Sequence, residues 1–197
     1  MPDHYYTSAP TSAHEERRFT LEFAGKTLRF ETDAGVFSKQ HVDPGSLLLC
    51  KSLPDSLCGD VLDMGCGWGA MTVMTLAAHP DVCMTMADVN ERALALAVKN
   101  VQENAMTAKA LISDGFSAIE GQFDAVITNP PIRAGKAVIY KMFEDARAHL
   151  KSGGALYLVI RKQQGAPSAL KYLQTLYASA QVIERDAGYW IIECKKA

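Results

Sequence analysis

The sequence has no long hydrophobic run. No apolar stretch approaches the ~20 residues of a membrane-spanning helix. The first residues, Met1 to Tyr6, show neither the basic patch nor the apolar stretch of a signal peptide. We therefore expect a cytoplasmic protein without a membrane partner.

Cysteine is scarce and irregularly spaced. The chain has 5 cysteines, an odd number, with no Cys-x-x-Cys pair and no histidine at metal-ligand spacing beside them. This pattern argues against disulfides and against a metal site. We predict buried thiols at all five positions, namely Cys50, Cys58, Cys66, Cys83 and Cys194.

Linkers, internal repeats and low-complexity tracts are also missing from the 197 residues. The composition, 48% hydrophobic and 21% charged, excludes a disordered, collagenous or coiled-coil chain. A chain of this length has room for one domain. We expect a single domain over 1–197, with an N-terminal extension (hairpin and short helix) over 1–57 and a core over 58–197.

The chain has little net charge, −2, but the charge is unevenly distributed. Residues 41–130 carry 4 basic and 11 acidic side chains, whereas residues 131–197 carry 11 basic and 5 acidic ones. A basic final third is typical of a face that binds a polyanion, and also of solvated helices. Both interpretations stay open at this level.

Apolar runs alternate with helical periods from about residue 60. This alternation predicts an α/β fold, a mostly parallel sheet with helices on both faces. Hairpins are expected over 19–30 and 181–194, and a short helix over 47–50. The expected strands are 60–64, 83–87, 109–112, 123–128 and 155–160. Four longer helices are expected: one over 70–78, one capped by Asn90, one over 138–150 and one over 166–180. The helix over 138–150 has its apolar face on Val138, Met142, Ala146 and Leu150, and Gly153-Gly154 marks its end.

The most informative stretch is a glycine loop, Asp63-x-Gly65-x-Gly67-x-Gly69, between a strand and a helix. Such glycines let the backbone approach a ligand at a helix N-terminus. The stretch from Gly65 to Ala70 also satisfies G-x-G-x-x-A, the dinucleotide pattern. Asp63 favours a zwitterionic ligand with an ammonium group, because a carboxylate would repel a pyrophosphate.

Further acids follow the next two expected strands. Asp88 is placed to bind ribose hydroxyls, and Asp114 is suited to accept a hydrogen bond from an adenine amino group. Phe116 is close enough in sequence to flank the adenine ring. Because the carboxyl ends of parallel strands share one edge of a sheet, we expect the three acids to line one crevice.

Asn129-Pro130-Pro131-Ile132 follows the fourth of these strands. Two consecutive prolines force an extended backbone away from the sheet. The Asn129 side-chain oxygen and the Pro130 carbonyl can then hold both N–H bonds of an amine whose lone pair is otherwise delocalised. The pattern predicts methyl transfer to nitrogen by alignment, without a metal or a nucleophilic cysteine.

These residues resemble class I S-adenosylmethionine-dependent methyltransferases of the methyltransferase small domain family. Residues 32–38, 86–90 and 128–136 are similar to the small-subunit ribosomal RNA methyltransferase C group, which modifies guanine N2 in 16S rRNA. The resemblance implies a Rossmann-like sheet of seven strands with an antiparallel last strand, and loops 35–38 and 43–46 folding over S-adenosyl-L-methionine. It implies cofactor contacts at Asp63, Gly65, Cys66, Gly67, Gly69, Asp88, Val89, Asp114, Gly115, Phe116, Asn129 and Phe37.

The chain departs from the group in two ways. It matches only the catalytic half of the two-domain members, and Ile132 stands where they have an aromatic residue for stacking on the base. We expect Arg133, Lys136, Lys141, Arg161 and Lys162 to hold the RNA backbone. The alternatives are an adenine-N6 or protein glutamine methyltransferase, an RNA-binding module that binds the cofactor without catalysis, and a dehydrogenase.

Overall fold

The computed structural model describes residues 17–33 and 41–197, and a seven-stranded sheet forms the centre of this part of the chain. The strand order is β5-β4-β3-β6-β7-β9-β8. Neighbouring strands from β5 to β7 pair in parallel, whereas β9 runs antiparallel to both β7 and β8. The Rossmann-like sheet with an antiparallel last strand is confirmed. Its strands are β3 (Asp60–Met64), β4 (Cys83–Asp88), β5 (Lys109–Ile112), β6 (Phe123–Thr128), β7 (Leu150–Arg161), β8 (Ser179–Asp186) and β9 (Tyr189–Lys195).

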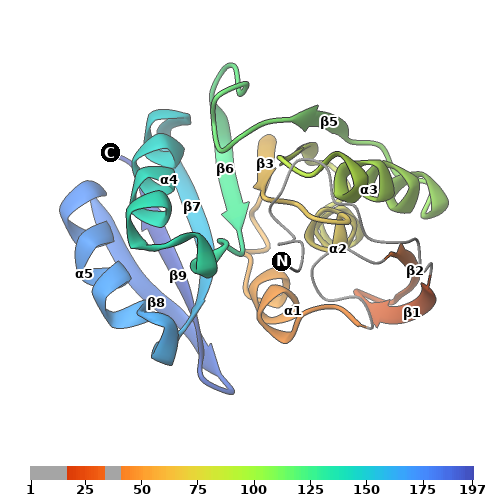
Figure 1. The fold of residues 1–197 in the computed structure, drawn as a ribbon, viewed down its shortest axis with the longest axis horizontal. Helices are drawn as coiled ribbons and strands as arrows, with labels where there is room; N and C mark the ends of the chain where they lie inside the picture. The colour runs from red at the N-terminus through yellow and green to blue at the C-terminus, as the bar shows by residue number, and fades with distance from the viewer. Residues whose placement is uncertain (1–16, 34–40) are drawn as a thin grey trace, which may run out of the picture.

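Helices cover both faces of the sheet (Figure 1). One face carries α4 (Lys136–Ala148) and α5 (Ala166–Leu176), and the other α1 (Pro44–Lys51), α2 (Ala70–Ala78) and α3 (Glu91–Glu103). Successive strand residues point to opposite faces. In β6, Ala125 and Ile127 therefore join the core under α1–α3, and Val126 joins the core under α4 and α5.

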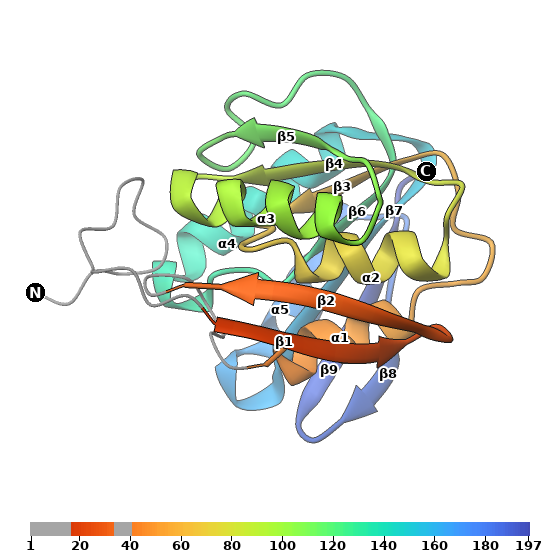
Figure 2. The same ribbon diagram turned by 90° about the vertical axis from the view of Figure 1, so that its right-hand side faces the viewer.

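The N-terminal hairpin, β1 (Arg17–Phe23) and β2 (Lys26–Thr32), lies against α2 and α3 (Figure 2). Two asparagine side chains of α3 bind the backbone of β2. Asn100 Oδ1 accepts from the Glu31 N–H at 2.7 Å, and Asn104 Oδ1 accepts from the Arg29 N–H at 2.9 Å. Both amide groups donate back to the carbonyls of the same two residues. The hairpin is thus fixed to the helix that follows β4.

Two predictions about the elements and one about the cysteines are wrong. The helix predicted over 138–150 ends at Ala148, and Gly153 and Gly154 lie inside β7. A Cβ at Gly154 would meet backbone oxygens of Asp124 and Lys151 at 3.0 Å, so its glycine serves close strand packing instead of a helix end. The helix predicted over 166–180 ends at Leu176, because the following residues pair with β9 as β8.

The third error concerns the cysteines. Cys58 and Cys83 are exposed, whereas Cys50, Cys66 and Cys194 are buried as predicted. Cys58 comes two residues before β3, and Cys83 is the first residue of β4. No helix in the described part of the chain is long and apolar enough to cross a membrane.

Candidate functional site

A cavity of about 780 Å³ opens at the carboxyl ends of the central strands. Its walls come from the loops after β3, β4, β5 and β6, from the start of α1, and from one side of α4. This is the edge at which open α/β sheets bind ligands. The cavity is lined by Asp43, Ser46, Met64, Gly65, Cys66, Gly67, Trp68, Ala70, Met71, Asp88, Val89, Ala93, Ser113, Asp114, Gly115, Phe116, Ser117, Asn129, Pro130, Pro131, Ala134, Ala137, Val138, Lys141, Met142, Asp145 and His149.

The glycine loop turns tightly over the end of β4. The N–H groups of Gly65 and Cys66 both donate to the Ala87 carbonyl, at 2.8 and 3.0 Å. The Gly67 N–H donates to Asp88 Oδ2 at 2.8 Å. Three backbone donors of the loop therefore bind protein acceptors. A pyrophosphate needs such donors, so this loop is not arranged as a dinucleotide cradle.

Gly69 lies outside the cavity wall, although the resemblance implied a cofactor contact there. Its φ is +85°, and a Cβ at this position would meet Cα and Cβ of Ala97 at 3.0 Å. Glycine therefore lets the start of α2 pack directly on α3.

Asp63 is fully buried beneath the loop and is not among the lining residues. Its Oδ2 accepts from the Thr72 hydroxyl at 2.7 Å, and its Oδ1 has no hydrogen-bond partner among residues 17–33 and 41–197. Burial raises the pKa of Asp63 to about 7, against the effect of the Thr72 hydrogen bond. A cationic group beside Asp63 would satisfy the open oxygen and stabilise its charge.

The other two predicted acids reach the cavity itself. Asp88 is partly buried, and burial raises the pKa of its carboxyl group. Its Oδ1 accepts from the Asn90 N–H at 2.8 Å, which fixes the side chain. Asp114 is exposed at the cavity rim. Phe116 is buried and its ring stacks on His149, with centroids 5.0 Å apart.

Asn129 lies where β6 ends, beside the two prolines, as predicted. Its Nδ2 donates to Asp43 Oδ2 at 3.1 Å and to Ser46 Oγ at 3.0 Å. Both acceptors stand at the start of α1, 83 or more residues away in sequence. The amide is thus bound through its nitrogen, which leaves Oδ1 as the acceptor it can offer a substrate.

Ile132 was expected at the cavity and Val138 in the core, and the structure places each of them where the other was expected. Ile132 packs against the core under α4 and α5 and is not a lining residue. Val138, predicted in the helix core, lines the cavity and is 50% exposed. The short helix η1 (Ile132–Ala134) precedes α4, and Val138 lies three and four residues before the lining residues Lys141 and Met142, on the same side of α4.

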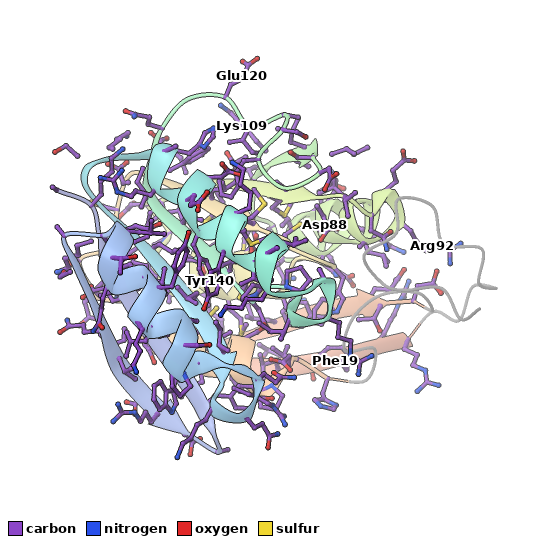
Figure 3. All side chains as sticks on the ribbon, turned by 60° about the vertical axis from the view of Figure 1, so that its left-hand side comes forward. Phe19, Asp88, Arg92, Lys109, Glu120 and Tyr140 are labelled. Carbon is purple, nitrogen blue, oxygen red and sulfur yellow. The ribbon has the colours of Figure 1, made fainter. Side chains whose placement is uncertain are left out.

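Of the five basic residues expected to hold RNA, one lines the cavity and two line a separate hollow. Arg133 is exposed in η1, and Lys136 Nζ lies 4.9 Å from the ring centroid of Tyr140, which Figure 3 shows near α4 and α5. Lys141 lines the cavity and pairs with Asp145.

Arg161 and Lys162 line a separate hollow at the end of β7. The Arg161 guanidinium stacks on the Tyr189 ring at 4.4 Å and donates to its hydroxyl. The predicted cofactor residue Phe37 lies outside the described residues, as does loop 35–38.

The comparisons with known proteins agree with this geometry. Residues 27–193 match the family model "Methyltransferase small domain". The chain belongs to this family. It is 40% identical to the uncharacterized protein YbxB of Bacillus subtilis, and the match covers the full length of both chains.

Two further relatives carry a stated activity. The ribosomal RNA small subunit methyltransferase C of Mannheimia succiniciproducens is 40% identical over 129 residues, which are 64% of this chain and 39% of that protein. The 16S rRNA N2 G1207 methyltransferase (RsmC) of T. thermophilus, solved with AdoMet and guanosine, superposes with a TM-score of 0.83 at 28% identity. The match covers 95% of this chain and 52% of that one.

The cavity fits S-adenosyl-L-methionine, the cofactor of this family. That molecule carries a sulfonium and an ammonium against one carboxylate, so its net charge is positive. The described cavity wall is acidic, with one lysine, Lys141, already paired. Its carboxylates are those of Asp43, Asp88, Asp114 and Asp145. Beneath them, the unpartnered Oδ1 of Asp63 is a further acceptor.

Sequence reasoning missed part of the α4 wall. Asp145 and His149 follow Lys141 at intervals of four residues, so all three share one side of the helix. The spacing was visible, but charged residues at this interval are typical of solvent-facing helices. Among the described residues, no group of three or more His, Cys, Asp or Glu could hold a metal ion.

Proposed function

We propose that this protein transfers a methyl group from S-adenosyl-L-methionine to an exocyclic amine, and that the amine is N2 of a guanine in small-subunit ribosomal RNA. The observation that carries the proposal is the fixed amide of Asn129 in the cavity wall. The substrate part of the proposal is supported by the stated activities of the RsmC relatives.

The protein's contribution to the reaction is alignment. Asn129 Oδ1 and the Pro130 carbonyl accept the two N–H bonds of the amine, so that its lone pair points at the methyl carbon. S-adenosyl-L-methionine supplies an electrophilic methyl group. Methyl transfer would place positive charge on the nitrogen while the sulfonium leaves as a neutral thioether. The two oxygens would stabilise that charge until one N–H proton passes to water.

The cofactor is held by the residues that the glycine loop and the acids bring together. We assign the ribose hydroxyls to Asp88 and the adenine amino group to Asp114, with Val89 and Phe116 beside the ring. Gly65, Cys66, Gly67 and Gly115 bring their backbone to the cavity wall. Asp63 acts from below, through charge, on the ammonium group.

The RNA backbone is assigned to Arg133 and Lys136, which are exposed and adjacent in sequence to the lining residues Ala134 and Ala137, with Arg161 and Lys162 at a separate hollow. Ile132 is half-buried, packs against the core under α4 and α5 and does not line the cavity, so we assign the contact with the base to another residue. Val138 is the exposed apolar side chain of the cavity wall and is placed to contact a base face.

The test is mass mapping of ribosomal RNA from a strain that lacks the gene. We expect one methyl group to be missing from a guanine of the small-subunit RNA. A wild-type copy and an Asn104→Ala copy should restore it, and an Asn129→Ala copy should not. Asn104 is a suitable control because its amide binds the hairpin backbone and it does not line the cavity. If methylation of the ribosomal RNA is unchanged in that strain, the proposed substrate is wrong.

A further inference from the structure

Two residues at the start of α1, far in sequence from the Asn-Pro-Pro motif, bind the amide group of Asn129. Asp43 Oδ2 and Ser46 Oγ both lie within 3.1 Å of Asn129 Nδ2. The amide nitrogen carries two hydrogens, so two acceptors use its whole donor capacity. All three residues line the cavity.

The chemistry of Asp43 decides which way the amide faces. An ionised carboxylate accepts hydrogen bonds and donates none, so it can bind the nitrogen of Asn129 and not the oxygen. With Nδ2 held there, Oδ1 must point elsewhere. If the amide turned over, its NH2 group would face the amine of the substrate, and two donors would oppose each other.

We propose that Asp43 and Ser46 are positioning residues for methyl transfer, which fix the Asn129 amide so that its oxygen faces the substrate amine. This proposal rests on the function proposed above, because it concerns the same reaction. The two residues act through Asn129 and need no contact with the reacting atoms.

The start of α1 is built to keep the two acceptors in place. Asp43 is the N-cap of the helix, and its Oδ2 also accepts from the Ser46 N–H at 3.0 Å. The next residue but one, Gly45, is buried, and a Cβ there would meet the Tyr189 ring at 2.7 Å. Helix α1 can therefore press directly against β9.

Arg161 adds a charge to this arrangement. Its guanidinium is stacked on the same Tyr189 ring and its pKa is raised, first by the Tyr189 hydroxyl and in part by attraction to Asp43. Arg161 thus places a positive charge that is attracted to Asp43 on the same ring that packs against Gly45.

Three substitutions separate helix capping from amide positioning. Asp43→Ser keeps a good N-cap, but its shorter side chain does not reach Asn129. Ser46→Ala removes the second acceptor. Asp43→Asn is the rescue variant, because an amide oxygen in place of Oδ2 can accept from both Ser46 and Asn129. Ser52→Ala is the matched control, since Ser52 Oγ binds the Leu48 carbonyl at the other end of α1.

Methyl transfer to the acceptor RNA should fall in kcat, with the cofactor's affinity preserved. We expect kcat to fall roughly 10- to 100-fold for Asp43→Ser and about 3- to 10-fold for Ser46→Ala, the scale of a misplaced catalytic group. Asp43→Asn should recover most of the loss, and Ser52→Ala should match the wild type. Calorimetry with S-adenosylhomocysteine should give similar affinities for all. A fall in that affinity with unchanged kcat would overturn the proposal.

A second measurement needs no substrate, so it distinguishes a failure here from a failure of the proposed function. The side-chain amide signal of Asn129 in a ¹⁵N–¹H spectrum can be assigned by its absence in Asn129→Ala. Its hydrogens should exchange slowly with solvent in the wild type and Asp43→Asn, and much faster in Asp43→Ser combined with Ser46→Ala. Equal exchange in these three proteins would show that the amide is not held by these residues.

Discussion

Asn100 of α3 donates a hydrogen bond of 2.8 Å to the carbonyl oxygen of Trp68, inside the glycine loop. The same amide nitrogen donates to the Glu31 carbonyl, and the amide oxygen accepts from the Glu31 N–H. One fully buried side chain therefore joins the N-terminal hairpin to the loop that faces the cofactor. The Trp68 ring extends this link, with its centroid 5.3 Å from that of Phe30.

The first prediction follows from this link. Asn100→Ala leaves three backbone groups without their partner, so the free energy of unfolding should fall by about 2–4 kcal/mol. Affinity for S-adenosylhomocysteine should fall with it, because the loop loses a support. Asn104→Ala, which also breaks amide bonds to β2, should cost about 1 kcal/mol and leave the affinity unchanged. Urea unfolding and calorimetry measure both, and equal affinities for the two variants would contradict the coupling.

The second prediction concerns the pH dependence of cofactor binding. The pKa of Asp63 is raised to about 7, so the group is largely protonated at pH 6 and ionised at pH 8. An ionised Asp63 attracts the ammonium of the cofactor. The affinity for S-adenosylhomocysteine should therefore rise as pH increases through about 7, and Asp63→Asn should remove that rise. Calorimetry between pH 5.5 and 8.5 tests this, and a parallel pH profile in the variant would argue against the assigned role.

The third prediction concerns the free energy of unfolding without cofactor, which the raised pKa of Asp63 should make dependent on pH. The folded protein holds the proton of Asp63 up to about pH 7, whereas the unfolded chain releases it near 3.8. Its contribution to stability is therefore lost as pH rises from about 4 through about 7, by roughly 4 kcal/mol at most. The difference in unfolding free energy between wild type and Asp63→Asn should change in this window. A constant difference from pH 4 to pH 8 would show that burial does not raise this pKa.

The fourth prediction distinguishes the two ligands that the glycine pattern allows. S-adenosylhomocysteine should bind and NAD should not, because the Gly67 N–H is bound to Asp88 and the cavity wall is acidic. Asp88→Ala should weaken the binding of S-adenosylhomocysteine at least 10-fold by removing the acceptor for the ribose hydroxyls. Asp81→Ala is the control, since Asp81 is exposed before the start of β4. Tight NAD binding would contradict the assignment of the cofactor.

The fifth prediction concerns RNA. Charge reversal of Arg133 and Lys136 should weaken RNA binding and reduce the dependence of affinity on salt, by about 0.7 in the log–log slope for each phosphate that is no longer neutralised. Lys109→Glu is the control, because Lys109 is exposed on β5 and Figure 3 shows it well away from Tyr140, the residue whose ring Lys136 contacts. Filter binding at several salt concentrations measures the slope. The same slope in both variants would remove these residues from the RNA face.

The elements that the sequence predicted well are those with a strong local signal. Strand β3 and helix α2 have the predicted bounds, because an apolar run meets a glycine turn between them. Asn90 caps α3 as predicted, with its side chain accepting from the Ala93 N–H. The errors lie at the ends of α4 and α5, where apolar residues suit either a helix or a strand and pairing with distant strands decides.

The site divides in the same way. The polar groups that meet at the strand ends, namely the glycine loop, Asp88 and Asn129, could be predicted from the residues alone, because parallel strands bring those ends to one edge. Tertiary structure alone decided that Asp63 lies buried below the cavity, that Gly69 serves packing, and that Val138 instead of Ile132 faces the cavity. It also decided that Asp43 and Ser46 bind Asn129. Contacts across more than 80 residues leave no local pattern in the chain, and packing of α1 on the sheet creates them.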